Sequence, residues 1–518
     1  MAASAGRRPN LLLILTDQHL PRVAGFAGDP VVQTPHLDAL ADRSVRFDAA
    51  VCASPCCTPS RMAMLTGKDV HHCSAWSNHW VIFPEHVTWP EHFGAHGYRT
   101  CLVGKMHFGG ADQHQGFQLR PYGDLRHGLG HQPDPLGMFP AYHGALSAGV
   151  TELPESLLQD NVVTRETLAF IREHHASAAE QPWFCCASYS RPHSPFTAPG
   201  RYLRRYRDRV PPVDLPSDFL ERMDPYSRRI WEGESGGPLT AEQALRAREA
   251  YYACVDYVND CIGDLLGPLE EEGLLENTIV IYTSDHGEMC GERGMWGKVV
   301  PYEPSIGVPL LVAAPDIPTG ASVAAPLSLT DLFPTTCGLA GLPVPAGLDG
   351  VDARDLLHAP SAPRPRSYAP STYTAYGTRP NAGVTQPEDA PAAAMRAIRG
   401  ERWKYVAIEG SDPLLFDLSS DPGETDNLAS EPHASHASVL AELEEAAMDG
   451  FSWDDVHRQL ARDRARVELF ASGLKPGTPN QYQLANGRVF DAEGALYDAR
   501  WLDIPESRGG GIIPQRFG

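Results

Sequence analysis

The sequence predicts an α/β fold, with a mainly parallel sheet sandwiched by helices and a smaller α+β carboxyl-terminal domain. Short apolar runs that are typical of buried strands alternate with amphipathic helical segments. The composition then shifts to Pro and Ala near residues 355–395, and a second group of short strands follows. The length of 518 residues is enough for more than one domain.

The first and larger part of the chain carries the elements of the predicted sheet. Its strands are expected at Asn10–Thr16, Thr100–Val103, Trp183–Ser188, Thr278–Thr283 and Pro309–Ala313. Helices are expected after the Thr34-Pro35 pair, where proline suits a first helical position, and at Asn161–Ala176 and Ala241–Leu269. In such sheets, ligands bind at the carboxyl ends of the strands.

We expect a catalytic domain at residues 1–375, a smaller domain at 376–475 and a tail at 476–518. The Pro- and Ala-rich stretch is interpreted as a long connection or domain boundary. After it, Met395–Ile398 and Trp403–Ile408 predict a hairpin, Leu414–Leu418 a further strand and Ser435–Met448 a helix. The tail has little periodicity, and we expect an arm that packs on its own body or on another subunit of a homo-oligomer.

Composition limits which classes of partner and which cellular compartment are expected. Lys and Arg total 43 against 65 Asp and Glu, a formal charge of −22, which argues against nucleic acid and anionic membranes as partners. No stretch approaches the roughly 20 apolar residues of a membrane span. The run Leu11–Leu15 after Arg7-Arg8 is too short for a signal core. The 11 cysteines show no disulfide framework, so we expect a cytoplasmic protein.

A cysteine and an arginine are expected at the start of one helix. Pro59 fits the first turn of a helix that runs to about Leu65, so Cys57 lies at the amino terminus, where free amide donors favour an anion. Arg61 is four residues on and can return to the same end. A lone cysteine before a helix is most often an ordinary buried residue, so this position needs support from other motifs.

Two acidic residues follow predicted strands. Asp17 ends the first strand, and Asp285 with His286 ends the strand at 278–283. A parallel sheet brings such positions together, and a pair of carboxylates beside an anion-binding helix start suits a divalent cation. Oxygen ligands of this kind suit Ca²⁺, Mg²⁺ or Mn²⁺.

The segment Cys57-Thr58-Pro59-Ser60-Arg61, followed by Leu65-Thr66-Gly67, resembles the signature of the type I sulfatases, which have the alkaline-phosphatase-like fold. The resemblance implies that Cys57 is oxidised to Cα-formylglycine by a formylglycine-generating enzyme. It also implies hydrolysis of a sulfate monoester to an alcohol and inorganic sulfate, with the formylglycine hydrate as nucleophile.

The resemblance further implies a metal centre. Its ligands would be Asp17, Gln18, Asp285, His286 and the formylglycine made from Cys57. Many members carry aspartate in place of Gln18 and asparagine in place of His286. The pattern here is similar to the choline sulfatase and phosphonate monoester hydrolase branches. We expect one Ca²⁺ or Mn²⁺ ion, with Mg²⁺ as an alternative, because an imidazole ligand favours a transition metal more than the common pattern does.

Four more residues complete the catalytic set that the resemblance implies. Alternation in an extended segment would put Lys105 and His107 on one face. Lys105 would pair with the formylglycine and a sulfate oxygen, and His107 would act as the base that releases sulfate. His193, between two prolines, would contact the substrate. Lys298 would hold the ester oxygen.

Two residues have supporting roles by the same resemblance. Arg61 would support the formylglycine. Asn78 falls where the choline sulfatase and phosphonate hydrolase branches have an active-site asparagine, and it would bind substrate. Among family members, the likeness is greatest to choline sulfatases, but the sequence does not identify the organic part of the substrate.

Particular residues separate the sulfatase from rival functions. A phosphonate monoester or phosphodiester hydrolase on the same scaffold is the nearest rival, and Lys105 and His107 favour the sulfatase because the phosphonate branch has Tyr and Thr there. A catalytically silent relative would leave Cys57 unmodified. A serine hydrolase is disfavoured because the chain lacks a Gly-x-Ser-x-Gly elbow.

Overall fold

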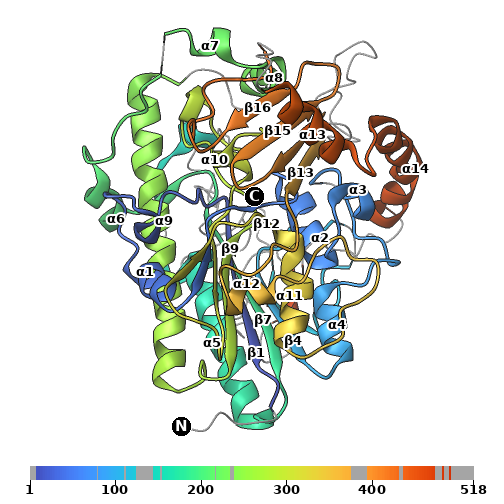
Figure 1. Cartoon of the computed structure of the whole chain (residues 1–518). Helices are drawn as coiled ribbons and strands as arrows, with labels where there is room; N and C mark the ends of the chain where they lie inside the picture. The colour runs from blue at the N-terminus through green and yellow to red at the C-terminus, as the bar shows by residue number, and fades with distance from the viewer. Residues whose placement is uncertain are drawn as a thin grey trace.

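The computed structural model in Figure 1 describes residues 7–78, 80–109, 112–123, 144–151, 154–215, 217–233, 239–374, 394–430, 436–472, 481–483 and 489–491. Its largest sheet has the strand order β11-β2-β10-β9-β1-β7-β4-β5. The bounds are β1 Asn10–Asp17, β2 Val45–Phe47, β4 Arg99–Gly104, β5 Leu119–Tyr122, β7 Trp183–Pro192, β9 Thr278–Ser284, β10 Leu310–Ala313 and β11 Ala321–Val323. Only β10 runs antiparallel to its neighbours in this sheet, so the predicted mainly parallel sheet is confirmed.

Helices cover both faces of the sheet, which explains why β1 is apolar throughout. Leu11, Leu13 and Leu15 belong to one buried cluster, and Leu12 and Ile14 belong to the other. Successive side chains of a strand point to opposite faces, so a strand covered on both sides needs apolar residues at every position.

The two helical layers are visible on either side of the sheet in Figure 1. One layer consists of α1 Pro35–Asp42, α5 Gln159–Ala178, α6 Gly200–Tyr206 and α9 Ala241–Glu271. The other contains α2 Cys57–Thr66, α4 Trp89–Ala95 and α11 Leu332–Leu339. Helices α1, α2, α5 and α9 were predicted from the sequence and are confirmed within a few residues at each end.

Shorter elements connect these layers. The helices are α3 Val70–Cys73, α7 Phe219–Arg222, α8 Pro225–Gly233, α10 Glu303–Ile306 and α12 Arg354–His358. The strands are β3 Ala50–Val51, β6 Gly149–Thr151, β8 Thr197–Pro199 and β12 Leu327–Ser328. Single 3-10 turns lie at Gly25–Ala27, Gly144–Ser147, Glu155–Leu157, Glu292–Gly294 and Leu329–Asp331.

A separate antiparallel sheet follows, as expected for the smaller α+β unit. Its strands are β13 Ala369–Thr374, β14 Ala394–Arg399, β15 Trp403–Ile408 and β16 Leu414–Asp417. Helix α13 (Ala437–Met448) packs on this sheet, and α14 (Trp453–Ser472) follows. The hairpin of β14 and β15, the strand β16 and the helix α13 were predicted and are confirmed.

The interpretation of residues 355–395 as a connection was wrong in part. Helix α12 begins just before this stretch, and the edge strand β13 lies within it. Pro370 suits an edge position, but the mixture of small and polar residues in β13 lacks the apolar pattern of a strand. The domain limits at residues 375 and 475 stay predictions. Of the predicted tail arm, only β17 (Gln481–Gln483) and β18 (Val489–Asp491) are among the described residues.

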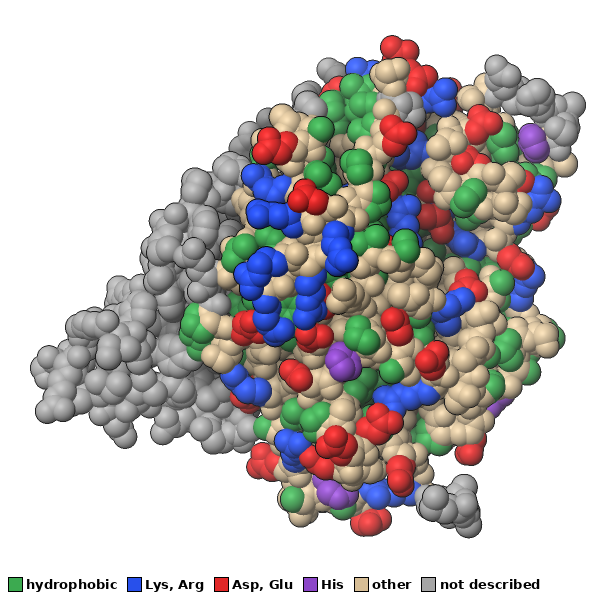
Figure 2. Space-filling view, turned by 90° about the vertical axis from the view of Figure 1, so that its left-hand side faces the viewer, with side chains coloured by type: hydrophobic (Ala, Val, Ile, Leu, Met, Phe, Trp, Pro, Cys, Tyr) green, Lys and Arg blue, Asp and Glu red, His purple; other side chains and the backbone are tan. Residues whose placement is uncertain are grey.

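The surface carries both signs of charge despite the acidic total. Figure 2 shows a group of Lys and Arg side chains among Asp and Glu on one face, and α6, which lies on that side of Figure 1, carries Arg201, Arg204 and Arg205. Arg201 pairs with Glu155, and Arg205 pairs with Asp256. In the described part of the chain, no helix has the length and hydropathy needed to cross a bilayer.

Candidate active site

The carboxyl ends of four adjacent parallel strands carry the polar residues predicted from the sequence. Strands β9, β1, β7 and β4 lie side by side and end at Ser284, Asp17, Pro192 and Gly104. Thr16 pairs with Ser284, and Asp17 pairs with Pro192, so the ends of β9, β1 and β7 are level, whereas Gly104 pairs with Ser188, four residues before the end of β7. Asp285 and His286, Asp17, His193 and Lys105 therefore lie along one edge of the sheet in that order.

A glycine is required where β4 delivers Lys105. Gly104 has φ of 93°, a conformation that side chains other than glycine rarely adopt, and a Cβ there would collide with the carbonyl oxygen of Ser188 in β7. The Lys105 amide donates to that same oxygen at 3.1 Å. The tight approach of β7 therefore turns the chain and directs Lys105 into the site.

Replacing Gly104 with alanine is expected to destabilise the protein by about 3 kcal/mol or more, since backbone strain and a backbone collision add. Gly97 is the matched control, because it has the same φ of 93° with nothing within 4 Å of a Cβ. Gly97→Ala should cost only about 1 kcal/mol. Urea unfolding of both variants measures the two costs, and equal costs would contradict the role of Ser188.

Helix α2 presents Cys57 as its first residue, at the same edge of the sheet. The Ser60 hydroxyl donates to the carbonyl oxygen of Asp285 at 2.5 Å, which ties the helix to the end of β9. Asn78 Oδ1 accepts from the Thr58 amide at 2.9 Å and from the Cys56 thiol at 3.2 Å. The predicted position of Cys57 at a helix amino terminus is confirmed.

Arg61 is fully enclosed between the two strand-end carboxylates. Its Nε donates to Asp285 Oδ2 at 2.8 Å, and its Nη2 donates to Asp17 Oδ2 at 2.9 Å. Its Nη1 donates to the carbonyl oxygen of Lys105 at 2.8 Å. All three side chains of this ion-pair network are inaccessible to solvent, so Arg61 joins three strand ends to α2.

The residues fit a divalent cation. Ligand atoms of Asp17, Cys57, Asp285 and His286 all lie within 4.8 Å of one another, and this is the only such cluster in the described part of the chain. Oδ1 of Asp17 is buried without a hydrogen-bond donor. His286 Nδ1 is 2.9 Å from the carbonyl oxygen of Gly287, which directs Nε2 toward the cluster. An orphaned carboxylate oxygen facing three more ligand atoms indicates a place for a cation.

The charges in the cluster also favour a bound cation. Although burial alone would raise it, the pKa of Asp17 is held well below its usual range by Lys105, His193 and Arg61. Burial raises the pKa of Asp285 despite the nearby Arg61. Positive charge in the cluster thus outweighs burial at Asp17 but not at Asp285, and a bound dication would favour the ionised form of both carboxylates.

Cys57 is surrounded by positive and polar groups. Its Sγ lies 3.2 Å from His286 Nε2 and 3.3 Å from Lys298 Nζ. Burial would raise the pKa of this thiol, but the charges of Lys298, His286 and Lys105 bring it well below its usual range. The site therefore stabilises negative charge at the tip of residue 57.

The Lys298 side chain contacts three of the predicted site residues. Its Nζ donates to Gln18 Oε1 at 2.5 Å and to Cys57 Sγ, and it lies 2.9 Å from His193 Nε2. Burial, together with Lys105 and Lys298, lowers the pKa of His193 to about 4. The neutral imidazole accepts from Lys298, so the proton between these two groups belongs to the lysine.

Lys105 and His107 both reach Cys57, but the predicted reason was wrong. Lys105 Nζ lies 2.6 Å from Asp17 Oδ2, and the His107 side chain is hydrogen-bonded to the Cys57 thiol. The segment is not an extended strand there, since His107 has φ of 57°. A left-handed turn, rather than alternation, brings the imidazole to the site.

The structure brings together every predicted site residue except Asn78, whose hydrogen bonds cap the start of α2. Side chains on the strand-end side are buried, whereas His107, His193 and Lys298 are half-buried and mark the open side. Sequence reasoning missed Glu288, which is fully buried beside Gln18 and accepts from its side-chain amide. Its position three residues after Asp285 was the available signal.

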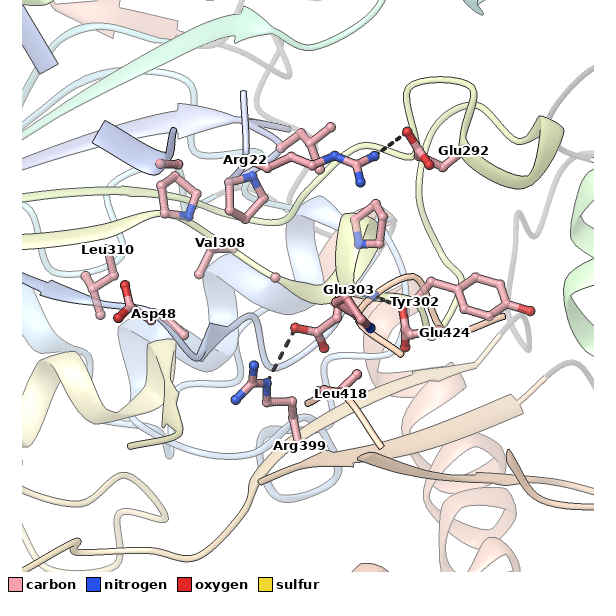
Figure 3. A pocket seen from close by; sticks show the side chains of 18 of the residues that line it. Arg22, Asp48, Glu292, Tyr302, Glu303, Val308, Leu310, Arg399, Leu418 and Glu424 are labelled. Atoms are coloured by element: carbon pink, nitrogen blue, oxygen red, sulfur yellow. Dashed lines mark hydrogen bonds and ion pairs between the residues drawn. The ribbon is translucent and has the colours of Figure 1, made fainter. Parts of the chain in front are cut away.

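A cavity of about 390 Å³ lies apart from this cluster, where the carboxyl-terminal sheet meets the main sheet. Figure 3 shows Arg22 paired with Glu292 and Arg399 paired with Glu303 around it. None of the predicted site residues lines this cavity. The candidate site is therefore the strand-end cluster, where the chemistry-bearing side chains converge.

Known protein families and individual relatives match most of this chain. Residues 9–342 match the family model described as "Sulfatase", and residues 291–449 match one described as "N-sulphoglucosamine sulphohydrolase, C-terminal". The chain is 30% identical over 451 residues to the choline-sulfatase of Rhizobium meliloti (strain 1021), covering 82% of this chain and 83% of that protein. It is also 30% identical over 439 residues to the ulvan-active sulfatase of Formosa agariphila, covering 82% and 78%.

Solved structures agree on the fold. The phosphonate monoester hydrolase of Agrobacterium radiobacter superposes with a TM-score of 0.73 and 25% identity, covering 88% of this chain and 96% of that one. The predicted alkaline-phosphatase-like α/β architecture, with its smaller carboxyl-terminal sheet, is confirmed.

Proposed function

This chain belongs to the sulfatase family, and on that premise we propose that residue 57 is its nucleophile after conversion to formylglycine. The protein is a sulfuric ester hydrolase, which cleaves a sulfate monoester to an alcohol and inorganic sulfate. One observation carries the proposal for residue 57. The Cys57 thiol lies at a helix start, within 3.3 Å of Lys298 and in one cluster with Asp17 and Asp285.

The Cys57 side chain marks the position of the aldehyde carbon and its hydrate. As a hydrate, formylglycine offers one hydroxyl to attack sulfur and a second whose deprotonation expels sulfate while the aldehyde re-forms. The groups that lower the pKa of the thiol would stabilise an ionised hydroxyl in its place.

Sulfatases in general use a divalent metal with the formylglycine. We propose that Asp17, Asp285, His286 and residue 57 hold it here, with Gln18 as a further ligand. When bound, the ion supplies positive charge that favours ionisation of a neighbouring hydroxyl. Two carboxylates with an imidazole suit Ca²⁺ or Mn²⁺, and Mg²⁺ is the alternative.

Lys105, Lys298 and Arg61 would stabilise the charge that develops on the transferring sulfuryl group. Lys105 and Lys298 flank Cys57, and Arg61 lies behind it between the carboxylates. Cations fixed before the reaction stabilise a developing charge without having to reorganise. His107, hydrogen-bonded to the thiol, is the base proposed to take the hydrate proton during sulfate release.

The leaving alcohol needs a proton, and Lys298 with His193 can supply one. Lys298 Nζ lies 2.9 Å from His193 Nε2, and the lowered pKa of His193 leaves the shared proton on the lysine. We propose that His193 contacts the ester and orients the Lys298 ammonium toward the leaving oxygen. Asn78 is proposed to bind substrate only through its amide nitrogen, since its oxygen already accepts two hydrogen bonds at the start of α2.

Phosphonate monoester or phosphodiester hydrolysis is the second candidate, favoured by the likeness to the Agrobacterium radiobacter enzyme. A sulfate monoester carries one negative charge. Lys105, Lys298 and a dication together carry more positive charge than that, so the site can bind either a sulfate ester or a phosphonate ester. The pair Lys105 and His107 supports the sulfatase.

The matured enzyme is expected to show a higher kcat/KM on an aryl sulfate than on the phosphonate monoester of the same phenol. Identical leaving groups remove differences in leaving-group pKa from the comparison. Steady-state rates after co-expression with a formylglycine-generating enzyme measure both constants. A higher kcat/KM on the phosphonate would contradict the assignment.

We further propose a cytoplasmic homo-oligomer that depends on a formylglycine-generating enzyme for maturation. All 11 cysteines are buried thiols, which supports a reducing compartment.

A further inference from the structure

Glu288 is a fully buried carboxylate to which the proposed reaction gives no role. It follows β9 by four residues, and no part of it is exposed to solvent. Its Oε1 accepts from the Cys290 amide at 2.9 Å and from the Gly297 amide at 2.6 Å. These two amides lie at either end of the loop that leads to Lys298, so one carboxylate oxygen closes that loop.

The second oxygen of Glu288 faces the predicted metal ligand Gln18. Glu288 Oε2 accepts from Gln18 Nε2, and Gln18 Oε1 accepts from Lys298 Nζ at 2.5 Å. Lys298 Nζ in turn donates to Cys57 Sγ at 3.3 Å. A continuous hydrogen-bonded chain therefore runs from Glu288 through Gln18 and Lys298 to Cys57.

The direction of this chain follows from the chemistry of its ends. A carboxylate can only accept hydrogen bonds, and an ammonium group can only donate them. An amide between the two must turn its NH₂ to the carboxylate and its oxygen to the ammonium. A metal ligand must also present oxygen, because an amide nitrogen in this state has no lone pair to share.

We propose that Glu288 is a positioning residue that fixes the Gln18 amide with its oxygen toward Lys298 and the metal centre. The inference rests on the proposed function, because it concerns a ligand of that metal. Buried hydrogen-bond partners of metal ligands set the orientation of those ligands and typically change metal affinity about 10–100-fold when they are removed.

Glu288→Gln would reverse the chain while keeping the shape of the side chain. The Cys290 and Gly297 amides both need an acceptor, so they hold the new amide by its oxygen. Its NH₂ then faces Gln18, which must turn its own oxygen away from the metal centre. The Gln18 NH₂ would meet the Lys298 ammonium, donor against donor.

Titration calorimetry with Mn²⁺ and, separately, Ca²⁺ on metal-stripped, matured protein at pH 8 tests the proposal. Glu288→Gln is expected to weaken binding of the ion by about 10–100-fold. The double variant Gln18→Glu/Glu288→Gln restores an acceptor to face the new NH₂ and an oxygen to face Lys298, and it should recover most of the loss. Glu292→Gln is the control, because that carboxylate lies on the same loop but pairs with Arg22 near the surface.

A merely structural role predicts a different pattern. Glu288→Gln and the double variant would then melt at similarly lowered temperatures, and Glu288→Gln would weaken metal binding as much in the Gln18→Glu background as in the wild type. That result, or unchanged affinity in Glu288→Gln, would overturn the proposal. If Glu288→Gln alone does not fold, recovery of folded, metal-binding protein in the double variant supports the pairing, and no recovery overturns it. A wild-type protein with neither metal binding nor turnover would instead refute the proposed function on which this inference rests.

Discussion

Replacing Cys57 with alanine is expected to lower kcat/KM for a sulfate monoester by on the order of 10⁵-fold or more. The variant cannot form the aldehyde, and it loses one of the four clustered ligand atoms. The fold should persist, because Cys57 is the first residue of α2, and alanine is a good helix former. Steady-state kinetics and thermal melting of the same preparation measure the two effects.

Cys56→Ala is the matched control for this experiment. Cys56 is adjacent, equally reduced and buried, but its Sγ bonds Asn78 and lies outside the ligand cluster. We expect this variant to keep its activity within about tenfold, since the thiol is only a weak hydrogen-bond donor to Asn78. Activity that survives in Cys57→Ala, or falls equally in both variants, would refute the assignment of the nucleophile.

Replacing Arg61 with methionine is expected to destabilise the metal-free protein by about 3–5 kcal/mol. Methionine fills much of the same volume but leaves the Asp17 and Asp285 carboxylates buried without their guanidinium partner. A dication between these carboxylates would replace part of the lost charge. Saturating Mn²⁺ should therefore raise the melting temperature of Arg61→Met more than that of the wild type.

Arg191→Met is the control, because it shows whether the extra stabilisation by Mn²⁺ follows the loss of any buried arginine or only the loss of Arg61. Arg191 is equally enclosed, and its Nη1 pairs with Asp160 at 2.5 Å, away from the ligand cluster. This variant should lose a similar amount of stability, yet gain no more from Mn²⁺ than the wild type gains. Equal metal stabilisation of both variants would contradict a cation site between Asp17 and Asp285.

The place of the candidate site in the fold could be predicted because it depends on where neighbouring parallel strands end. Asp17 ends β1 and Asp285 follows β9, and these neighbouring parallel strands end level, since Thr16 pairs with Ser284. The apolar runs come from burial on both faces of the sheet, as Leu12 and Leu13 illustrate by entering opposite clusters. Motif spacing and topology together were therefore sufficient to predict which residues cluster at the strand ends.

Other features depend on contacts between distant segments and could not be predicted. His107 reaches Cys57 through a left-handed turn, which local sequence does not indicate for a histidine. Strand β13 is held by pairing with β14 rather than by its own apolar pattern. The role proposed for Glu288 depends on its hydrogen bond with Gln18, which lies 270 positions away in the chain. Each of these is decided by tertiary structure that overrides local preference.

The central claim is that residue 57 becomes an aldehyde beside a bound dication, and the mass of one peptide tests it most directly. Trypsin releases residues 47–61, which contain Cys52, Cys56 and Cys57. After co-expression with a formylglycine-generating enzyme, tandem mass spectrometry should find this peptide lighter, with oxygen in place of sulfur at position 57 only. An active enzyme whose peptide keeps all three thiols would contradict the account.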